Sequence, residues 1–177
     1  MSNGFEVPSS LILRAYPKRI WSGRTINAVD KNPALGWEVP VKGGSLNGVL
    51  LKGSAHHSAM LHFYGAGMSV NREIGRLEWL HQYYDMTVGC LDYRGYGATA
   101  LDWDVEQLVE DGVRAFDALE AAQRVRQSPY ADSFRIHLQG FSMGAAVALQ
   151  VALRRPQAAS LTLLAPPASW DGLQAAS

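Results

Sequence analysis

The sequence contains a single cysteine, Cys90, which excludes an intramolecular disulfide framework and a cysteine-based zinc site. Cys90 lies in the apolar run 86–91 and is expected to be a small core residue rather than a nucleophile. The sequence also lacks an H-E-x-x-H zinc helix and a Gly-Lys-Ser/Thr phosphate loop. It therefore implies no metal and no cofactor.

Long apolar runs and an excess charge of one sign are also missing. No stretch of about 18 apolar residues is present, so no membrane span is expected. Sixteen basic residues balance sixteen acidic residues without a basic run, which argues against a nucleic-acid partner. The first residues lack a basic segment followed by an apolar one, so we expect no secretory signal and a cytoplasmic location.

The composition is that of a globular protein, with 177 residues, 47% of them hydrophobic and 18% charged. Residues 1–36 contain three prolines and are expected to be irregular apart from a short strand at 10–16. Residues 37–177 are expected to form the single folded domain.

Strand and helix patterns alternate along this domain. Two extended runs, 37–41 and 46–52, flank a glycine turn at 42–45 and predict a β-hairpin. Further strands are predicted at 59–64, 86–92, 134–138 and 160–165, with helices at 70–84, 105–119 and 145–153. This order predicts a three-layer α/β/α fold around a mostly parallel sheet. Chemistry in such sheets collects at the carboxyl ends of the strands.

The strongest motif is G-x-S-x-G at Gly140–Gly144, between a predicted strand and a predicted helix. Glycine at both flanks suits a strained turn that exposes the oxygen of Ser142 above the sheet. The alternative is an ordinary serine at a helix start.

A second motif, Tyr64-Gly65-Ala66-Gly67, also follows a strand. It either provides a second N–H donor at Ala66, beside that of Met143, or is merely a glycine turn.

A third motif, D-Y-R-G-Y-G, begins at Asp92. We expect Asp92 to be structural and to pair with Arg94 or with backbone donors. The overlapping G-x-G-x-x-A pattern at 95–100 is not followed by a strand that bears an acid about 20 residues on. It therefore does not predict a dinucleotide site.

In this order the three motifs resemble those of the α/β-hydrolase superfamily, most closely its serine-aminopeptidase and lysophospholipase-like branch. That branch carries H-G-x-G, D-x-R-G-x-G and G-x-S-x-G, and the resemblance covers roughly residues 37–168. It implies a nucleophile at Ser142, oxyanion donors at Ala66 and Met143, and loop support from the four motif glycines, which are Gly65, Gly67, Gly140 and Gly144. Tyr64 stands where that branch has a scaffold histidine.

The resemblance is incomplete at the carboxyl end. In the family an acid follows strand 7 and a histidine follows strand 8, whereas this sequence ends at Ser177, just past the predicted sixth strand. We therefore expect a hydrolase-type sheet that lacks its last two strands. No histidine follows Ser142, and Asp171 has no histidine to orient. The five upstream histidines are expected to be structural or surface residues: His56, His57, His62, His81 and His137.

The sequence thus predicts acyl transfer to water on a small-molecule acyl substrate. A carboxylic ester is the first choice and an amide or peptide the second. Turnover is expected to be weak because no base is found. The alternative is a catalytically incomplete hydrolase fold, either a fragment or a non-enzymatic binding protein. An open apolar edge at strand 160–165 predicts self-association or poor solubility.

Overall fold

The computed structural model describes residues 36–124 and 134–167. The short strand expected at 10–16 and the acid Asp171 lie outside these residues. The first strand begins at Gly36, one residue before the domain boundary predicted from the sequence.

Within residues 36–124 and 134–167, six strands form one sheet, and three helices connect them in the order that the sequence predicts. The elements are β1 (Gly36–Val41), β2 (Gly44–Leu51), β3 (Ala55–Phe63), α2 (Val70–Tyr84), β4 (Met86–Leu91), α3 (Val105–Arg124), β5 (Arg135–Phe141), α4 (Met143–Arg154) and β6 (Ser160–Leu164). The strand order across the sheet is β1-β2-β4-β3-β5-β6. The hairpin strands β1 and β2 run antiparallel, while β4, β3, β5 and β6 are mutually parallel.

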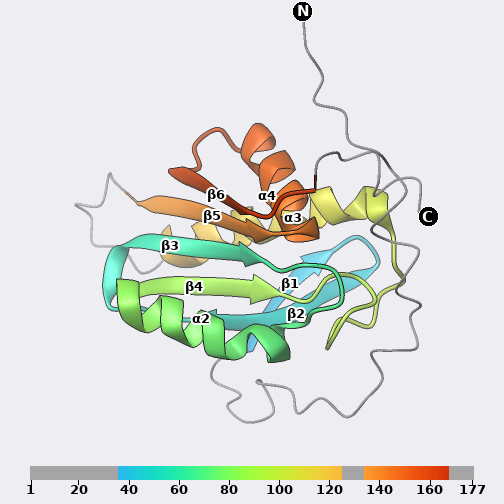
Figure 1. Ribbon diagram of the computed structural model, residues 1–177, viewed down its shortest axis with the longest axis horizontal. Helices are drawn as coiled ribbons and strands as arrows, with labels where there is room; N and C mark the ends of the chain where they lie inside the picture. Colours follow the sequence, from blue (N-terminus) through green and yellow to red (C-terminus); the bar gives the residue numbers. More distant parts are fainter. Residues whose placement is uncertain (1–35, 125–133, 168–177) are drawn as a thin grey trace, which may run out of the picture.

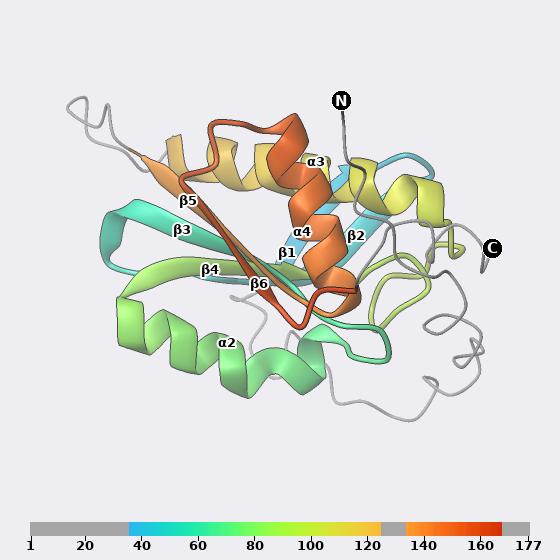
Figure 2. The same ribbon diagram turned by 45° about the horizontal axis from the view of Figure 1, so that its top comes forward.

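The helices cover both faces of the sheet, which gives the three layers expected from the sequence. Figure 1 shows α2 in front of the strands, and Figure 2 shows α2 on one face with α3 and α4 on the other. The buried core is contributed by every strand except β6 and by the inward stripes of all three helices. Because β4, β3, β5 and β6 are parallel, their carboxyl ends lie at the same end of the sheet.

The hairpin turn is tighter than predicted. Val41 pairs directly with Gly44, so the connecting loop is only Lys42 and Gly43. Gly43 has a φ of +90°, a conformation that favours glycine. The second glycine, at 44, belongs to β2 rather than to the turn.

Cys90 lies in β4 and is fully buried, as expected of a core residue. Burial raises the pKa of its thiol well above the ordinary value, which disfavours the reactive thiolate. In residues 36–124 and 134–167, no helix combines the length and apolar character needed to cross a bilayer. The same residues contain no cluster of three His, Cys, Asp or Glu side chains that could hold a metal ion.

Candidate active site

Ser142 occupies the single residue between β5 and α4. Its backbone has φ 51° and ψ −121°, a conformation that L-residues rarely adopt. The N–H of Ser142 donates to the carbonyl of Leu164 at 2.9 Å, and its own carbonyl accepts from the N–H of Ala145 at 2.9 Å. The elbow is therefore tied to the end of β6 on one side and to the first turn of α4 on the other.

The two glycines that flank Ser142 are required by close packing. A Cβ at Gly140 would overlap the carbonyl oxygen of Gly144. A Cβ at Gly144 would overlap the backbone oxygens of Phe63 and Tyr64, at the end of β3. The G-x-S-x-G spacing thus allows the turn to press directly against β3, the neighbouring parallel strand.

The loop between β3 and α2 passes beside the elbow. A Cβ built on Gly65 would lie 2.9 Å from the ring of Phe141 and 3.2 Å from the Cβ of Ser142. Gly67 has a φ of +80°, so this loop also depends on glycine. Ala66 is half-buried between these glycines.

Met143 is the first residue of α4 and is fully buried. The N–H groups in the first turn of a helix have no acceptor within the helix, and the N–H of Met143 is one of these groups. This N–H follows Ser142 directly in the chain. The structure therefore brings the nucleophile candidate close to a helix-start N–H and to the loop that carries Ala66.

A buried carboxylate holds the β3–α2 loop in place. Asp92 follows β4 and accepts three hydrogen bonds: from the Tyr64 hydroxyl at 2.9 Å, the Val70 N–H at 2.7 Å and the Ala98 N–H at 2.8 Å. The Val70 bond caps the first turn of α2. Ser69 holds the N-cap position, but its side chain makes no capping bond.

Tyr64 connects this carboxylate to the next loop. Its hydroxyl accepts from the N–H of Tyr93 at 3.1 Å, and its carbonyl accepts from the Tyr93 hydroxyl at 2.9 Å. Tyr64 is fully buried, and burial raises the pKa of its hydroxyl well above the ordinary value. Burial also raises the pKa of Asp92, against the opposing effect of the three donors. The tyrosine at the scaffold-histidine position of the resembling family is therefore an anchor of both loops.

The sequence left two partners open for Asp92, and the structure selects the backbone donors. Arg94 instead pairs with Asp111 of α3, with Nε–Oδ2 and Nη2–Oδ1 distances of 2.5 and 2.9 Å. Arg94 also donates to the carbonyl of Lys42 in the hairpin turn. Burial raises the pKa of the Asp111 carboxyl, against the favourable effect of Arg94. This ion pair joins the β4–α3 loop to α3 and to the hairpin.

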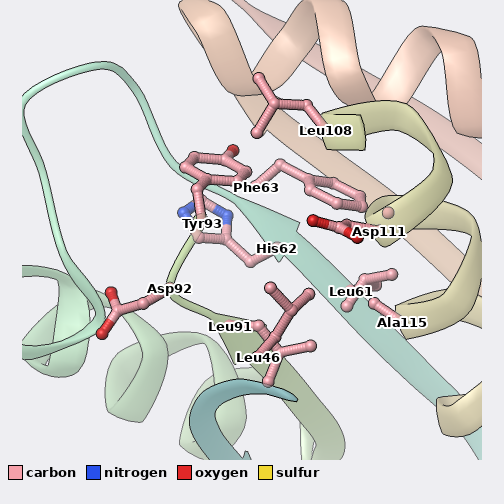
Figure 3. A pocket seen from close by; sticks show the side chains of 11 residues that line it. Leu46, Leu61, His62, Phe63, Leu91, Asp92, Tyr93, Leu108, Asp111 and Ala115 are labelled. Carbon is pink, nitrogen blue, oxygen red and sulfur yellow. The ribbon is translucent and has the colours of Figure 1, made fainter. Parts of the chain in front are cut away.

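A small cavity lies between the sheet and α3, next to this ion pair. Figure 3 shows Leu46, Leu61 and Leu91 of three strands on one side and Leu108 and Asp111 of α3 on the other. Its volume is about 20 Å³, enough for about one water molecule and too small for a substrate. A larger open cleft of about 520 Å³ follows the β4–α3 loop and the start of α3, and Ser142 does not line it.

Three histidine side chains are described by the structure, those of His62, His81 and His137, and each contacts a group other than Ser142. His62 is buried, with Nδ1 3.0 Å from Gln139 Oε1 and Nε2 3.4 Å from Glu73 Oε2. His81 contacts the Met86 carbonyl at the start of β4. These two histidines are structural, as expected from the sequence.

His137 lies in β5, with Nδ1 2.8 Å from the hydroxyl of Ser160. It precedes Ser142 by five residues along the chain, which corresponds to about 16 Å of extended strand. His56 and His57 lie near the start of β3, at the opposite end of the sheet from the elbow. No histidine side chain described by the structure contacts Ser142.

Comparison with protein-family models and with curated proteins gives no match. Solved structures do share the fold. An α/β-hydrolase-type protein of unknown function from Agrobacterium tumefaciens superposes with a TM-score of 0.62 at 20% identity. The superposition covers 74% of this chain and 60% of the Agrobacterium protein. EstE1, a thermophilic carboxylesterase cloned from a metagenomic library, superposes with a TM-score of 0.61 at 25% identity. This superposition covers 74% of this chain and 46% of EstE1.

A serine hydrolase homologue from Coxiella burnetii superposes with a TM-score of 0.57 at 19% identity, covering 80% of this chain and 67% of its own. The chain thus spans between about half and two thirds of the length of these three structures. The sheet of this chain has the strand order β1-β2-β4-β3-β5-β6 with helices on both faces (Figure 2). This chain has the α/β-hydrolase fold through its sixth strand.

Proposed function

We propose that this chain carries the nucleophile and the oxyanion donors of a serine hydrolase, with Ser142 as the nucleophile. The single observation that carries the proposal is the conformation of Ser142, a non-glycine residue with φ 51° at a strand-to-helix turn. Strained conformations of this kind persist where the surrounding structure enforces them, and they cluster at active sites. Here the flanking glycines and the hydrogen bond to Leu164 enforce it.

The proposed reaction is acyl transfer from an ester to water. The Ser142 oxygen attacks the ester carbonyl, and the N–H groups of Ala66 and Met143 donate to the oxyanion that develops. Collapse of this intermediate breaks the ester C–O bond, releases the alcohol and leaves an acyl-serine that water hydrolyses. A carboxylic ester is the preferred substrate class, and the likeness to a carboxylesterase at 25% identity supports this choice. An amide or peptide is the second class.

Proton transfer limits the rate. The hydroxyl of Ser142 must lose its proton as it attacks, and no histidine described by the structure contacts it. Loss of the triad histidine in subtilisin lowers turnover by on the order of 10⁶, and the oxyanion hole and substrate binding alone retain about 10³–10⁴ over water. The loss of about 10⁶ in turnover is larger than the acceleration of about 10³–10⁴ that remains. We therefore expect this chain to hydrolyse activated esters only slowly.

Two measurements test this proposal. Hydrolysis of p-nitrophenyl butyrate at neutral pH should stay below about 1 s⁻¹. Without a base, this residual rate comes from the oxyanion hole and substrate binding more than from attack by Ser142, so it should change little in Ser142→Ala. A fluorophosphonate, followed over hours by intact mass, should add slowly to the wild-type chain and not to Ser142→Ala. Ser160→Ala is the matched control, because the Ser160 hydroxyl contacts a histidine but lies inside a strand. Its labelling should equal that of the wild type.

Faster turnover would overturn the rate argument. An activity above about 1 s⁻¹ that disappears in Ser142→Ala would mean that an upstream histidine or a second chain supplies the base. His62 and His137 would then be the first residues to replace. An adduct found on Ser160 rather than on Ser142 would contradict the assignment of the nucleophile.

A second candidate function is binding of an acyl ligand without turnover. It is favoured by the partners of the described histidines, which are Gln139 and Glu73 for His62 and Ser160 for His137. Complete absence of a fluorophosphonate adduct on Ser142, together with saturable binding of butyrate, would support this candidate over the hydrolase.

A further inference from the structure

The two proposed oxyanion donors lie on different elements of the fold. Ala66 belongs to the β3–α2 loop, whereas Met143 begins α4 directly after the elbow. Asp92 ties the loop to the end of β4 through Tyr64 and Val70. The helix that follows the loop, α2, packs on β4 and β2. The position of the loop relative to the elbow, which follows β5, therefore depends on other contacts.

Contacts that reach β5 begin at His62, near the end of β3. His62 lies beside Gln139 of β5 in the sheet, and its Nδ1 is 3.0 Å from Gln139 Oε1. Its Nε2 is 3.4 Å from Oε2 of Glu73 in the first turn of α2. His62 is 1% exposed and Glu73 is 4% exposed. Within the described residues Nε2 forms no hydrogen bond, so the Glu73 carboxylate is the polar group that it faces.

A second set of contacts leads from the same carboxylate to the elbow. Oε2 of Glu73 is 3.2 Å from Nε of Arg76, one turn further along α2. The Arg76 guanidinium lies over the ring of Phe141, 5.8 Å from the ring centroid. Phe141 is the last residue before the elbow, and its ring lies against Gly65 of the β3–α2 loop. Glu73 thus joins a contact that reaches β3 and β5 to one that reaches the elbow.

Stability alone does not explain a carboxylate at this buried position. The cost of removing charges from water often exceeds their mutual attraction, and apolar side chains of similar volume are often as stabilising. An ionised carboxylate between two partners does fix the position of the helix that carries it. Contact with His62 lowers the pKa of Glu73 despite the opposing effect of burial, so the carboxylate is ionised at neutral pH. It can therefore set where α2 lies relative to β3 and β5.

We propose that Glu73 is a positioning residue of the oxyanion hole. Through His62 and Arg76 it holds the loop that carries Ala66 at a fixed distance from the elbow that carries Met143. This inference rests on the proposed function, because it concerns the same two donors. Removal of one oxyanion donor costs about 10²–10³ in turnover. Displacement of one donor should cost part of that factor, so we expect a loss of about 10-fold or more when Glu73 no longer holds the loop.

Hydrolysis of p-nitrophenyl butyrate measures this role, because its slow rate depends on the oxyanion hole more than on Ser142. Glu73→Gln keeps the size of the side chain and removes its charge. Its kcat should fall about 10-fold or more while KM stays within about twofold, because the donors act on the transition state rather than on the bound ester. Glu78→Gln, at an exposed position of the same helix, is the matched control and should change neither constant. A kcat of Glu73→Gln equal to that of the wild type would overturn the proposal.

A double apolar variant separates positioning from stability. His62→Leu combined with Glu73→Met removes both buried partners and keeps similar side-chain volumes. Its urea midpoint should therefore equal or exceed that of Glu73→Gln, which leaves the histidine without its ionised partner. Its kcat should nevertheless be at least as low as that of Glu73→Gln. A kcat that returns to the wild-type value together with stability would show that the pair only supports the fold, and would refute the positioning role.

Labelling of Ser142 distinguishes failure of this inference from failure of the proposed function. The phosphoryl oxygen of a fluorophosphonate takes the place of the oxyanion, so Glu73→Gln should slow labelling by a factor similar to its loss of kcat. Equal labelling of Glu73→Gln and the wild type would refute the role of Glu73 and leave the nucleophile standing. A wild type that is never labelled would refute the nucleophile, and the comparison of kcat values would still decide the role of Glu73.

Discussion

Tyr64→Phe removes one oxygen from the buried cluster that joins the β3–α2 and β4–α3 loops. The Tyr64 hydroxyl donates to the Asp92 carboxylate at 2.9 Å and accepts from the Tyr93 N–H at 3.1 Å. A hydrogen bond to a charged group contributes about 1.5–3 kcal/mol, and a buried N–H left unpaired costs about 1–3 kcal/mol. These contributions overlap, so we expect the free energy of unfolding to fall by about 2–4 kcal/mol. This is a large part of the 5–15 kcal/mol typical of a domain.

Urea unfolding, followed by circular dichroism and tryptophan fluorescence, measures this loss. Tyr83→Phe is the matched control, because Tyr83 is 68% exposed on α2. Its free energy of unfolding should stay within about 0.5 kcal/mol of the wild type. A loss in Tyr64→Phe no larger than in Tyr83→Phe would refute the assigned role of the cluster.

The cost of Tyr64→Phe should also depend on pH. The hydroxyl stabilises the ionised carboxylate and thereby lowers the pKa of Asp92, so its removal raises that pKa further. The free energy of unfolding of the wild type therefore exceeds that of the variant by most when Asp92 is ionised. The difference in unfolding free energy should be larger at neutral pH and should shrink as pH falls through the folded-state pKa of Asp92. A difference that stays constant down to pH 3 would mean that the tyrosine does not act on the carboxylate.

Four further substitutions test neighbouring features. Gly75→Ala has open space around its Cβ in α2 and should stabilise the fold by about 1 kcal/mol, whereas Gly144→Ala overlaps the backbone of β3 and should cost about 3 kcal/mol in urea unfolding. Contact with His62, followed by Arg76, lowers the pKa of Glu73, so Glu73 stabilises the fold above pH ~4.3. The advantage of the wild type over Glu73→Gln should shrink as pH falls from ~4.3 through the lower folded-state pKa of Glu73; an advantage as large at pH 3 as at pH 7 would contradict this. Asp111→Ala leaves a buried guanidinium unpaired and should cost about 3–5 kcal/mol; a loss below about 1 kcal/mol would show that solvent reaches the pair.

Local patterns were sufficient to predict the sheet and the elbow. Each apolar run is short and bounded by glycine or proline, and the order of strands and helices fixes a mostly parallel topology. The steric reason for Gly140 is also local, because its Cβ would overlap the carbonyl oxygen of Gly144, whereas Gly144 is required by the backbone at the end of β3, which is distant in the sequence. The sequence reveals the motif through its spacing, and the structure supplies the contact that explains Gly144.

The partners of buried polar groups could not be predicted in this way. Asp92 meets Tyr64 across 28 residues, and Arg94 meets Asp111 across 17 residues. The cap of α2 comes from Asp92 rather than from the serine beside the helix. Such pairings depend on which strands become neighbours in the sheet, and periodicity does not encode that. The tyrosine at position 64 was the one available signal, because it replaces the scaffold histidine of the resembling family directly after a strand.

The strain at Ser142 provides a direct test of whether the elbow is maintained for chemistry. A non-glycine residue in so sparsely populated a conformation costs about 1–3 kcal/mol. Glycine adopts that conformation freely but loses about 0.5–1 kcal/mol of chain entropy relative to alanine. Ser142→Gly should therefore be more stable than Ser142→Ala by about 0.5–2 kcal/mol, because alanine keeps the strain. Both variants remove the proposed nucleophile, so the comparison isolates the backbone.

Matched urea titrations of Ser142→Gly and Ser142→Ala give this difference directly. The hydrogen bond from residue 142 to Leu164 is made by the backbone and survives in both variants. If Ser142→Gly is the less stable of the two, the turn is not strained, and the main support for a nucleophile at this position is lost. If Ser142→Gly is the more stable variant, Ser142 of the wild type keeps a strained backbone conformation. Its hydroxyl is then held at the carboxyl end of the sheet at a cost in stability. A residue selected for packing alone would not show that pattern.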